Sequence, residues 1–318
     1  MEPTELCENC SDIPFIKLHD GLLRQKWPPL SFVLGALSDI LARTCPMCRL
    51  VSTAVLARTR RPNRPSEAIK VNWNPFDHYF SIPAAAASVR FLSGEVASGE
   101  YAAGGLIDPT LINNWLMTCK SKHGEKCQSP PPDANTDHGS FRMIDLRSMC
   151  IVDSSILPEF VALSYVWGRA PTLRLLAENK SDLMKPGGLL AYWDQVPLTI
   201  RDAVTLVGML GLQYLWVDSL CLVQDDKADM EGGIKAMDTV YEQALFTIIA
   251  ADGSDARHGL PGISSDTRPT VQKICEVVSG ICLAVSQNVR ELLKATSYQT
   301  RAWTNSGYHA AKSCLLAI

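Results

Sequence analysis

The sequence contains no apolar run long enough to cross a membrane and no excess of basic over acidic residues. Its longest apolar runs, such as LFTIIAA at 245–251, fall far short of the roughly 18 residues that a membrane span requires. The chain carries 30 Lys and Arg against 33 Asp and Glu, so its formal net charge is -3. That balance argues against nucleic acid and anionic membranes as partners, because both attract proteins through basic surfaces.

The N-terminus, MEPTELCENC, also lacks the basic stretch followed by an apolar stretch that marks a secretory signal. We therefore expect a cytoplasmic protein. In that reducing compartment, the 11 cysteines are expected to be buried thiols, metal ligands or reactive groups rather than disulfides. With 318 residues, of which 47% are hydrophobic, the chain can bury one large core or two modest cores.

Two cysteine pairs near the N-terminus have the spacing of a structural zinc site. Cys7 and Cys10 form one C-x2-C pair, and Cys45 and Cys48 form the other. The 34 residues between the pairs exceed the usual separation in a zinc ribbon. The four cysteines can therefore be interpreted either as a zinc site or as a set of free thiols.

A second set of metal-ligand types lies further along the chain. Cys119, His123 and Cys127 are spaced by four residues, which would align them on one face of a helix. Zinc binding there would need a fourth ligand from elsewhere, so we rank this set below the first. In both sets a structural role is favoured over a catalytic one.

A proline-rich segment divides the chain. QSPPPDANTDHG at 128–139 resists regular structure because three consecutive prolines stand beside polar residues. We predict a cysteine-rich, partly helical N-terminal region at 1–127, a linker at 128–140 and a second domain at 141–318. Within the first region, the apolar positions of LSFVLGALSDILA suit a helix.

After the linker, short apolar strands alternate with amphipathic helices, which is typical of a parallel sheet with crossover helices. FVALSYVWG, YLWVDSLCLV and FTIIAADG are predicted to be buried strands. One helix is predicted to begin at Pro197 and Thr199, with Asp202 as a capping-box-like residue, and to end at Gly211. A second helix is predicted to start near Asp229.

In an open parallel sheet, ligands bind beyond the carboxyl ends of the strands, so the residues at those ends form the candidate site. Asp218 is costly to bury alone, and we expect it to cap a loop or helix or to line a pocket. Cys221 is either a buried thiol or a nucleophile whose base would be His258, the nearest histidine in sequence. On the predicted strand, Asp218 and Cys221 point to opposite faces and cannot form a dyad.

Other polar and aromatic residues lie at the same strand ends. Tyr165 and Trp167 share one strand face and Ser164 takes the other, with Trp167 favoured as a packing residue over a stacking platform. Gln224, Asp225 and Asp226 could bind ribose or a metal-bound water. They could equally belong to a solvated loop that caps the following helix.

Several of these segments together resemble the fungal heterokaryon-incompatibility (HET) domain, in the order and spacing of that family, over about residues 141–318. They are SYVWG at 164–168, LTIRDA at 198–203, YLWVDSLCLVQDD at 214–226, MDTVYEQA at 237–244, ADGSDARHGLPG at 251–262 and TRAWT at 300–304. The resemblance implies a self/non-self recognition and cell-death module. Its partners would be other proteins of the incompatibility pathway or a second copy of the chain.

HET domains are thought to be remote relatives of Toll/interleukin-receptor (TIR) domains, which implies a flavodoxin-like, doubly wound and mostly parallel sheet. Some TIR domains cleave NAD with a motif glutamate, and the HET counterpart of that motif is Trp-Thr-x-Gln-Glu. After Trp303, this chain has Ser306 and Gly307 at the positions of the Gln and Glu. Because glycine cannot accept a proton, an inactive chain is expected. The early end after AKSCLLAI is expected to reflect a truncated product, a degenerate paralogue or a faulty gene model.

Three hypotheses follow for the function. The leading one is a non-enzymatic signalling protein of vegetative incompatibility. The alternative is a TIR-like enzyme that cleaves NAD or a related nucleotide, with Asp218 or Asp225 as its carboxylate. A zinc-dependent DNA-binding regulator draws only on the cysteine pairs and conflicts with the acidic balance. The candidate ligand-pocket residues are Ser164, Tyr165, Trp167, Asp218, Gln224, Asp225, Arg301 and Trp303.

Overall fold

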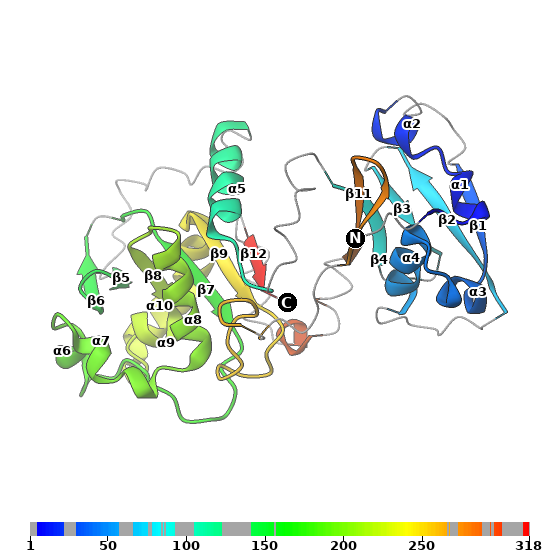
Figure 1. The fold of residues 1–318 in the computed structure, drawn as a ribbon. Coiled ribbons are helices and arrows are strands. Elements are labelled where there is room, and N and C mark those ends of the chain that lie inside the picture. The colour runs from blue at the N-terminus through cyan, green and yellow to red at the C-terminus, as the bar shows by residue number, and fades with distance from the viewer. Residues whose placement is uncertain are drawn as a thin grey trace. The chain divides into compact units, whose positions relative to one another are not determined.

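The computed structural model of the chain forms two compact units, which we describe separately (Figure 1). The first unit comprises Met1–Gly105 and Pro269–Leu292, and the second comprises Leu106–Arg268 and Leu293–Ile318. The structure describes residues 5–21, 30–56, 66–75, 78–83, 85, 87–92, 105–122, 141–155, 157–265, 267, 273–287, 293, 296–300 and 314–317. The predicted linker at 128–140 lies outside the described residues.

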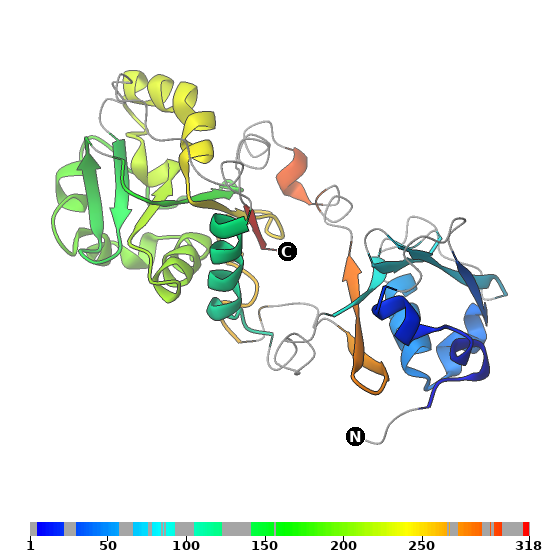
Figure 2. The same cartoon turned by 90° about the horizontal axis from the view of Figure 1, so that it is seen from above.

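The first unit is a six-stranded antiparallel sheet that curves around helices as a half-barrel (Figure 2). In sheet order, its strands are β1 (Ser31–Ala36), β2 (Ala68–Asn74), β3 (Tyr79–Ser81), β4 (Ala87–Phe91), β11 (Ile281–Gln287) and β10 (Ile274–Val278). Its helices are α1 (Glu8–Ser11), α2 (Phe15–His19), α3 (Leu37–Ala42) and α4 (Pro46–Leu56). The buried face of α4, which includes Met47, Leu50 and Val51, packs against β4, β10 and β11.

The β10–β11 hairpin belongs to the first unit, although its residues come after most of the second unit in the sequence. Strand β11 pairs with β4 from Leu283 opposite Phe91 to Gln287 opposite Ala87. The boundary predicted at 128–140 therefore does not coincide with the two compact units, because 269–292 returns to the first one.

The prediction of one helix for LSFVLGALSDILA is wrong for its first half. The N-terminal region, predicted to be partly helical, also contains a sheet. Ser31–Ala36 form β1, and only Leu37–Ala42 form the helix α3. Gly35 has φ +113, which a helix cannot accommodate, and the pairing of β1 with β2 shifts register between Val33 and Gly35. The apolar pattern alone could not reveal this break.

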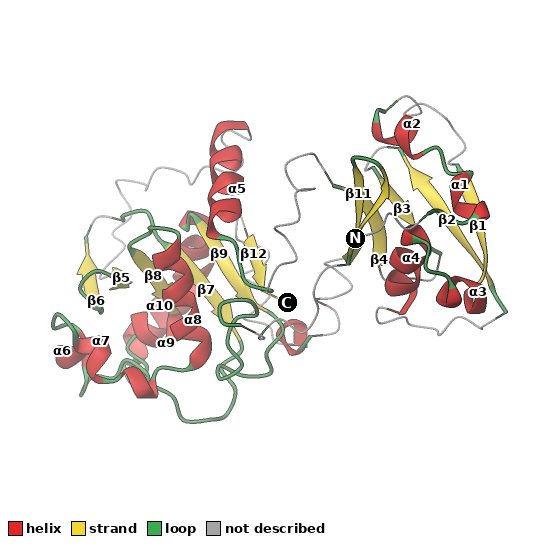
Figure 3. Ribbon diagram, viewed as in Figure 1, coloured by secondary structure: helices red, strands yellow, loops and turns green. Residues whose placement is uncertain are grey.

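The second unit is mixed α/β, as the sequence predicts, around a sheet of order β12-β9-β7-β8-β5-β6 (Figure 3). Strands β12, β9, β7 and β8 pair in parallel, whereas β5 pairs antiparallel with both β8 and β6. The strands are β5 (Phe141–Asp145), β6 (Cys150–Ser154), β7 (Val161–Tyr165), β8 (Tyr214–Val217), β9 (Phe246–Ala250) and β12 (Cys314–Ala317). Parallel pairing is thus confined to one side of the sheet.

The helices of the second unit are α5 (Pro109–Lys122), α6 (Lys180–Leu183), α7 (Gly188–Ala191), η2 (Trp193–Gln195), α8 (Leu198–Met209), α9 (Asp218–Cys221), α10 (Lys227–Gln243) and η3 (Ser297–Thr300). One of them, α5, precedes the strands of the unit, and the other described helices lie between the strands. Helix α8 confirms the predicted helix, with Pro197 at its N-cap and Gly211 at φ +73 just beyond its end. Among the described residues, we find no helix both long and apolar enough to cross a membrane.

The strand predicted for YLWVDSLCLV is too long. It ends at Val217, and the next four residues form the short helix α9. The Asp218 carboxylate accepts a hydrogen bond from the Ser219 backbone N–H, an arrangement that starts a helix instead of extending a strand. The opposite-face argument for Asp218 and Cys221 is therefore also wrong, because the two residues lie on a helical turn.

Candidate functional site

The parallel strands β7, β8 and β9 end at one edge of the second sheet, and the motif segments gather there. The backbone N–H of Ala256 donates to the carbonyl of Trp167, and the backbone N–H of Thr199 donates to the carbonyl of Ala256. The segment that follows β7, the start of α8 and the loop after β9 are therefore joined at this edge. This is the edge at which ligands bind in open parallel sheets.

Asp218 is held by the aromatic residue that follows β7. The indole Nε1 of Trp167 donates to both carboxylate oxygens, at 3.1 and 3.0 Å, and the Ser219 N–H donates at 2.7 Å. Burial raises the pKa of Asp218 to about 7, although these hydrogen bonds favour the charged form. The Asp218 carboxylate thus contacts the α9 backbone, but Val217 is the N-cap of α9 and no side-chain hydrogen bond caps the helix.

Two further hydrogen bonds fix the end of β7. The hydroxyls of Ser164 and Tyr298 lie 2.6 Å apart, and the Tyr165 hydroxyl donates to Ser219 Oγ at 2.8 Å. Ser164 therefore faces η3, whereas Tyr165 and Trp167 both face α9, which agrees with the predicted alternation. Sequence reasoning missed Tyr298, because no sequence pattern distinguishes it from the other tyrosines of the chain.

At two motif glycines, neighbouring side chains leave no room for a Cβ atom. Gly168 has φ +79, and a Cβ there would lie 2.3 Å from the Cβ of Asp255. Gly259 has φ +84, and its Cβ would lie 2.6 Å from Asp202 Oδ2. Both positions bring the loop after β9 close to its neighbours.

Helix α8 anchors that loop through two side chains of its first turns. The Thr199 hydroxyl oxygen accepts from the Gly259 N–H at 3.1 Å, and Asp202 Oδ2 accepts from the Leu260 N–H at 2.7 Å. Asp202 was predicted to close a capping box, but no side-chain hydrogen bond caps α8. The carboxylate binds a segment distant in sequence instead, a contact that local spacing cannot predict.

The acidic residues after α9 support neighbouring backbone. Asp226 Oδ1 accepts from the N–H groups of Ala228 and Asp229 and so caps α10, as one of the two sequence interpretations expects. Asp225 Oδ1 accepts from the Ala177 N–H at 2.9 Å. The Gln224 amide donates to the carbonyls of Asp218 and Leu222.

Cys221 lies in an environment that disfavours the thiolate. The side chain is 1% exposed, and burial raises its pKa to about 12. Its sulfur accepts a hydrogen bond from the Val217 N–H at 3.3 Å. His258, the base considered for it, pairs with Asp252 at 3.1 Å. These features fit the buried-thiol interpretation of Cys221.

An ion pair that the sequence did not reveal ties β5 to α10. Arg142 is 3% exposed, and its guanidinium contacts both oxygens of Asp229. Its Nε donates to the Cys221 carbonyl at 2.8 Å, and Asp229 Oδ2 also accepts from the Val223 N–H at 2.7 Å. A charge so deeply buried is tolerated because it is fully hydrogen-bonded. An arginine inside FRMID gave no sequence signal of this partner.

The two predicted cysteine pairs meet in the first unit. The sulfurs of Cys7, Cys10, Cys45 and Cys48 all lie within 4.8 Å of one another, and the last three residues are buried. Cys7 precedes α1, and Cys48 lies in the first turn of α4. Strand β1 and helix α3, which lie between the two pairs, fold so that the pairs lie together despite the 34 residues between them. The cluster could hold a metal ion.

The chemistry of the cluster suits a divalent cation. The Cys48 sulfur lies 3.7 Å from those of Cys7 and Cys10. Hydrogen bonds to Cys45 and Cys48 raise the pKa of Cys10, because they favour its neutral form. Arg43 Nη1 points at the Cys7 sulfur, at 3.7 Å, and supplies positive charge next to the thiols.

Of the remaining predicted site residues, the structure describes only Cys119. Cys119 lies on α5 and is partly exposed. Its proposed co-ligands His123 and Cys127 lie outside the described residues, as do Arg301, Trp303, Ser306 and Gly307.

Comparison with known families agrees with the gathered motif segments. Residues 160–305 match the family model described as heterokaryon incompatibility protein (HET). No curated protein and no solved structure matches the chain. The matched range includes β7, α8, β8, α10 and β9, whose ends form the site described above. The chain therefore contains a heterokaryon incompatibility (HET) domain over residues 160–305.

Proposed function

We propose that this chain acts in heterokaryon incompatibility as a cytoplasmic signalling module that works through protein contacts. The observation that carries the proposal is the HET match over 160–305. Its partners would be other proteins of the incompatibility pathway or a second copy of the chain. The parallel pairing of β7, β8, β9 and β12 supports a doubly wound, TIR-like arrangement of this domain.

The non-enzymatic part of the proposal draws on how the strand-end carboxylates are used. Asp218, Asp225 and Asp226 each accept hydrogen bonds from groups of the chain itself. A catalytic carboxylate must instead reach the reacting atoms of a substrate. Gly307, at the position of the motif glutamate, supports the same conclusion.

One observation favours NAD cleavage as a second candidate. The Asp218 carboxyl, with its pKa raised to about 7, lies in the range of a general acid or base. It also lies at the edge where open parallel sheets bind ligands. Against this stands its double hydrogen bond with Trp167, which opening of the site would have to break.

Expression of the full chain in a fungal host, with cell death and cellular NAD followed together, tests the proposal. We expect cell death without a preceding fall in NAD, and the same death with a D225N variant. A fall in NAD that precedes death, and that D218N abolishes while the protein stays folded, would establish the enzymatic alternative. Absence of any death or growth phenotype would contradict the signalling role.

We further propose that the four-cysteine cluster binds one structural zinc ion. Tetrahedral zinc with Zn–S bonds of about 2.3 Å places its sulfurs about 3.8 Å apart. The two separations of 3.7 Å from Cys48 are close to that edge length. Zinc would join the turn at Cys7 to the start of α4, and Arg43 would offset the excess negative charge of four thiolates.

Metal analysis of the purified full chain tests the zinc proposal. We expect one zinc per chain, lost in C10S and C48S and retained in C119S. The C119S variant is the matched control, because Cys119 is a partly exposed thiol outside the cluster. Zinc retained in C10S but lost in C119S would assign the metal to the second cysteine set instead. A metal-free wild-type protein purified without chelators would mean that the cluster is a group of free thiols.

A further inference from the structure

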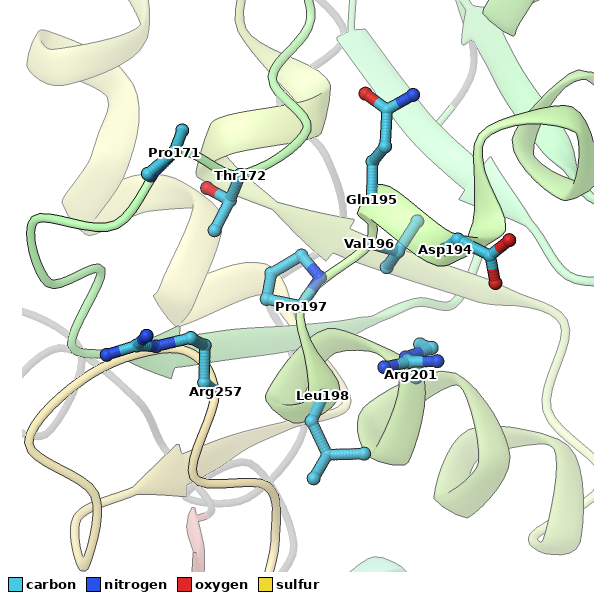
Figure 4. A pocket seen from close by; sticks show the side chains of 9 residues that line it. All are labelled: Pro171, Thr172, Asp194, Gln195, Val196, Pro197, Leu198, Arg201 and Arg257. Carbon is cyan, nitrogen blue, oxygen red and sulfur yellow. The ribbon is translucent and has the colours of Figure 1, made fainter.

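A pocket separate from the Trp167–Asp218 contact opens at the start of α8 (Figure 4). Its volume is about 660 Å³, within the range of small-molecule sites. Its walls come from the segment after β7 with Thr172, from η2 with Asp194 and Gln195, and from the first residues of α8. Arg201 on α8 and Arg257 on the loop after β9 also line it.

Arg201 has an unmet hydrogen-bonding need in this pocket. Its Nε is buried and has no hydrogen-bond partner among the described residues. Over the same residues, no ion pair involves its guanidinium, and Asp194 in the pocket wall is not paired with it. A buried donor left unpaired is unfavourable. The half-buried Arg201 side chain also lines the pocket, and an acceptor from outside the chain can reach it there.

Arg257 differs from Arg201 in being already bound. Its guanidinium donates to both oxygens of Asp255, at 3.2 and 2.7 Å, and its side chain is 67% exposed. That pair neutralises much of its charge and fixes its position beside the pocket. In Figure 4, Arg257 and Arg201 lie on opposite sides of Pro197 and Leu198. Arg201 is thus the cation available to a ligand, and Arg257 is a second, weaker contact.

The walls of the pocket are held in place before any ligand binds. The Leu173 N–H donates to the Gln195 carbonyl at 3.1 Å, which joins the segment after β7 to η2. The Thr199 N–H donates to the Ala256 carbonyl at 3.0 Å, which joins α8 to the loop that carries Arg257. A site with fixed walls loses little conformational freedom on binding.

We propose that this pocket binds a phosphate-bearing small molecule, with a phosphate group accepting hydrogen bonds from Arg201. Guanidinium groups bind phosphate through paired, charge-assisted hydrogen bonds. The Thr172 hydroxyl and the Gln195 amide offer further donors in the wall. Asp194 directs the phosphate toward Arg201, because its carboxylate would repel phosphate oxygens placed beside η2. The proposal is independent of both zinc binding and NAD cleavage.

Calorimetric titration of the full chain with pyrophosphate tests the proposal. We expect binding to the wild type, at least about tenfold weaker binding to R201Q, partial recovery in R201K and a smaller loss in R257Q. R147Q is the matched control, because Arg147 is exposed and lies outside the pocket, and it should bind as the wild type does. Wild-type protein that does not bind, or R201Q and R257Q that both bind unchanged, would overturn the proposal.

Two further arms identify the source of the phosphate and guard against misfolding. Displacement of pyrophosphate by NAD would identify the ligand as a nucleotide. Displacement by inorganic phosphate alone would identify the ligand as the free anion. Both outcomes support the site. Circular dichroism checks that each variant folds. If R201Q does not fold, the affinities of R257Q and R201K for pyrophosphate still test the proposal. Binding of NAD without nicotinamide release would leave the signalling proposal intact. The pocket proposal and the signalling proposal can therefore fail separately.

Discussion

The cysteine cluster and the edge of the second sheet differ in how their polar groups are satisfied. At the sheet edge, Trp167, Thr199 and Asp202 meet partners within the chain, and the segments are joined without any added group. In the cluster, four thiols face one another, with the Arg43 guanidinium beside Cys7. Under the zinc proposal, the first unit therefore depends on an external ion, whereas the edge of the second sheet is held by hydrogen bonds within the chain.

Removing the metal should have the largest effect, and it should be confined to the first unit. Structural zinc contributes on the order of 10 kcal/mol to the folding of small metal sites. Chelation or C48S should therefore strip hydrogen-exchange protection from α4 and from β10 and β11, which pack on it, while β7 stays protected. Equal loss of protection in both units, or no loss anywhere, would contradict the comparison. C119S serves as the control.

Breaking the Arg142–Asp229 pair should be the largest single-residue effect in the second unit. R142M leaves the Asp229 carboxylate without its buried cation, so the free energy of unfolding should fall by about 3 to 5 kcal/mol. The double variant R142M/D229L should recover most of that loss in denaturant unfolding. If R142M costs less than about 1 kcal/mol, the pair is not a main support of the second unit.

Asp218 should make the stability of the second unit depend on pH. Its folded pKa, about 7 against an ordinary 3.8, means that the native state binds a proton more tightly than the unfolded state does. Stability is therefore greatest below the unfolded pKa and falls as the pH rises from about 4 to about 7. Three pKa units correspond to about 4 kcal/mol, so D218N should gain about 2 to 4 kcal/mol relative to the wild type over that range. Parallel pH profiles of the two proteins would contradict this expectation.

The difference between alanine at Gly168 and alanine at Gly211 should be the smallest of these effects, and the second variant is its internal control. Gly168 and Gly211 both have positive φ, at +79 and +73, but only at Gly168 would a Cβ collide with Asp255. Thermal unfolding should show G211A losing about 1 kcal/mol from the backbone conformation alone, and G168A losing about 1 to 3 kcal/mol more. Equal losses in the two variants would mean that the loop after β9 moves aside freely.

The sequence predicted the elements whose signals are local. Helix α8, the cap of α10 by Asp226 and the buried strands β7 and β9 follow from periodicity and capping residues within short windows. The cysteine spacing likewise predicted a cluster, because the two pairs have the same form. These features need no knowledge of distant segments.

The features that sequence reasoning missed depend on distant partners. The Arg142–Asp229 pair and the Ser164–Tyr298 contact join residues far apart in the chain, with no periodic signal at either end. Strand β8 ends at Val217, where the Asp218 carboxylate binds the Ser219 N–H, although the apolar pattern continues as if for one long strand. The return of β10 and β11 to the first unit is decided by pairing with β4, and a linear division into domains could not anticipate it.

Incubation of the purified full chain with NAD, with nicotinamide release as the readout, is the decisive test of the non-enzymatic proposal. We expect no release above that of a heat-inactivated sample, because Asp218 and Asp225 accept hydrogen bonds from the chain itself and the resemblance to HET domains places Gly307 at the motif glutamate. Release that depends on protein concentration, and that D218N abolishes without unfolding the chain, would contradict it.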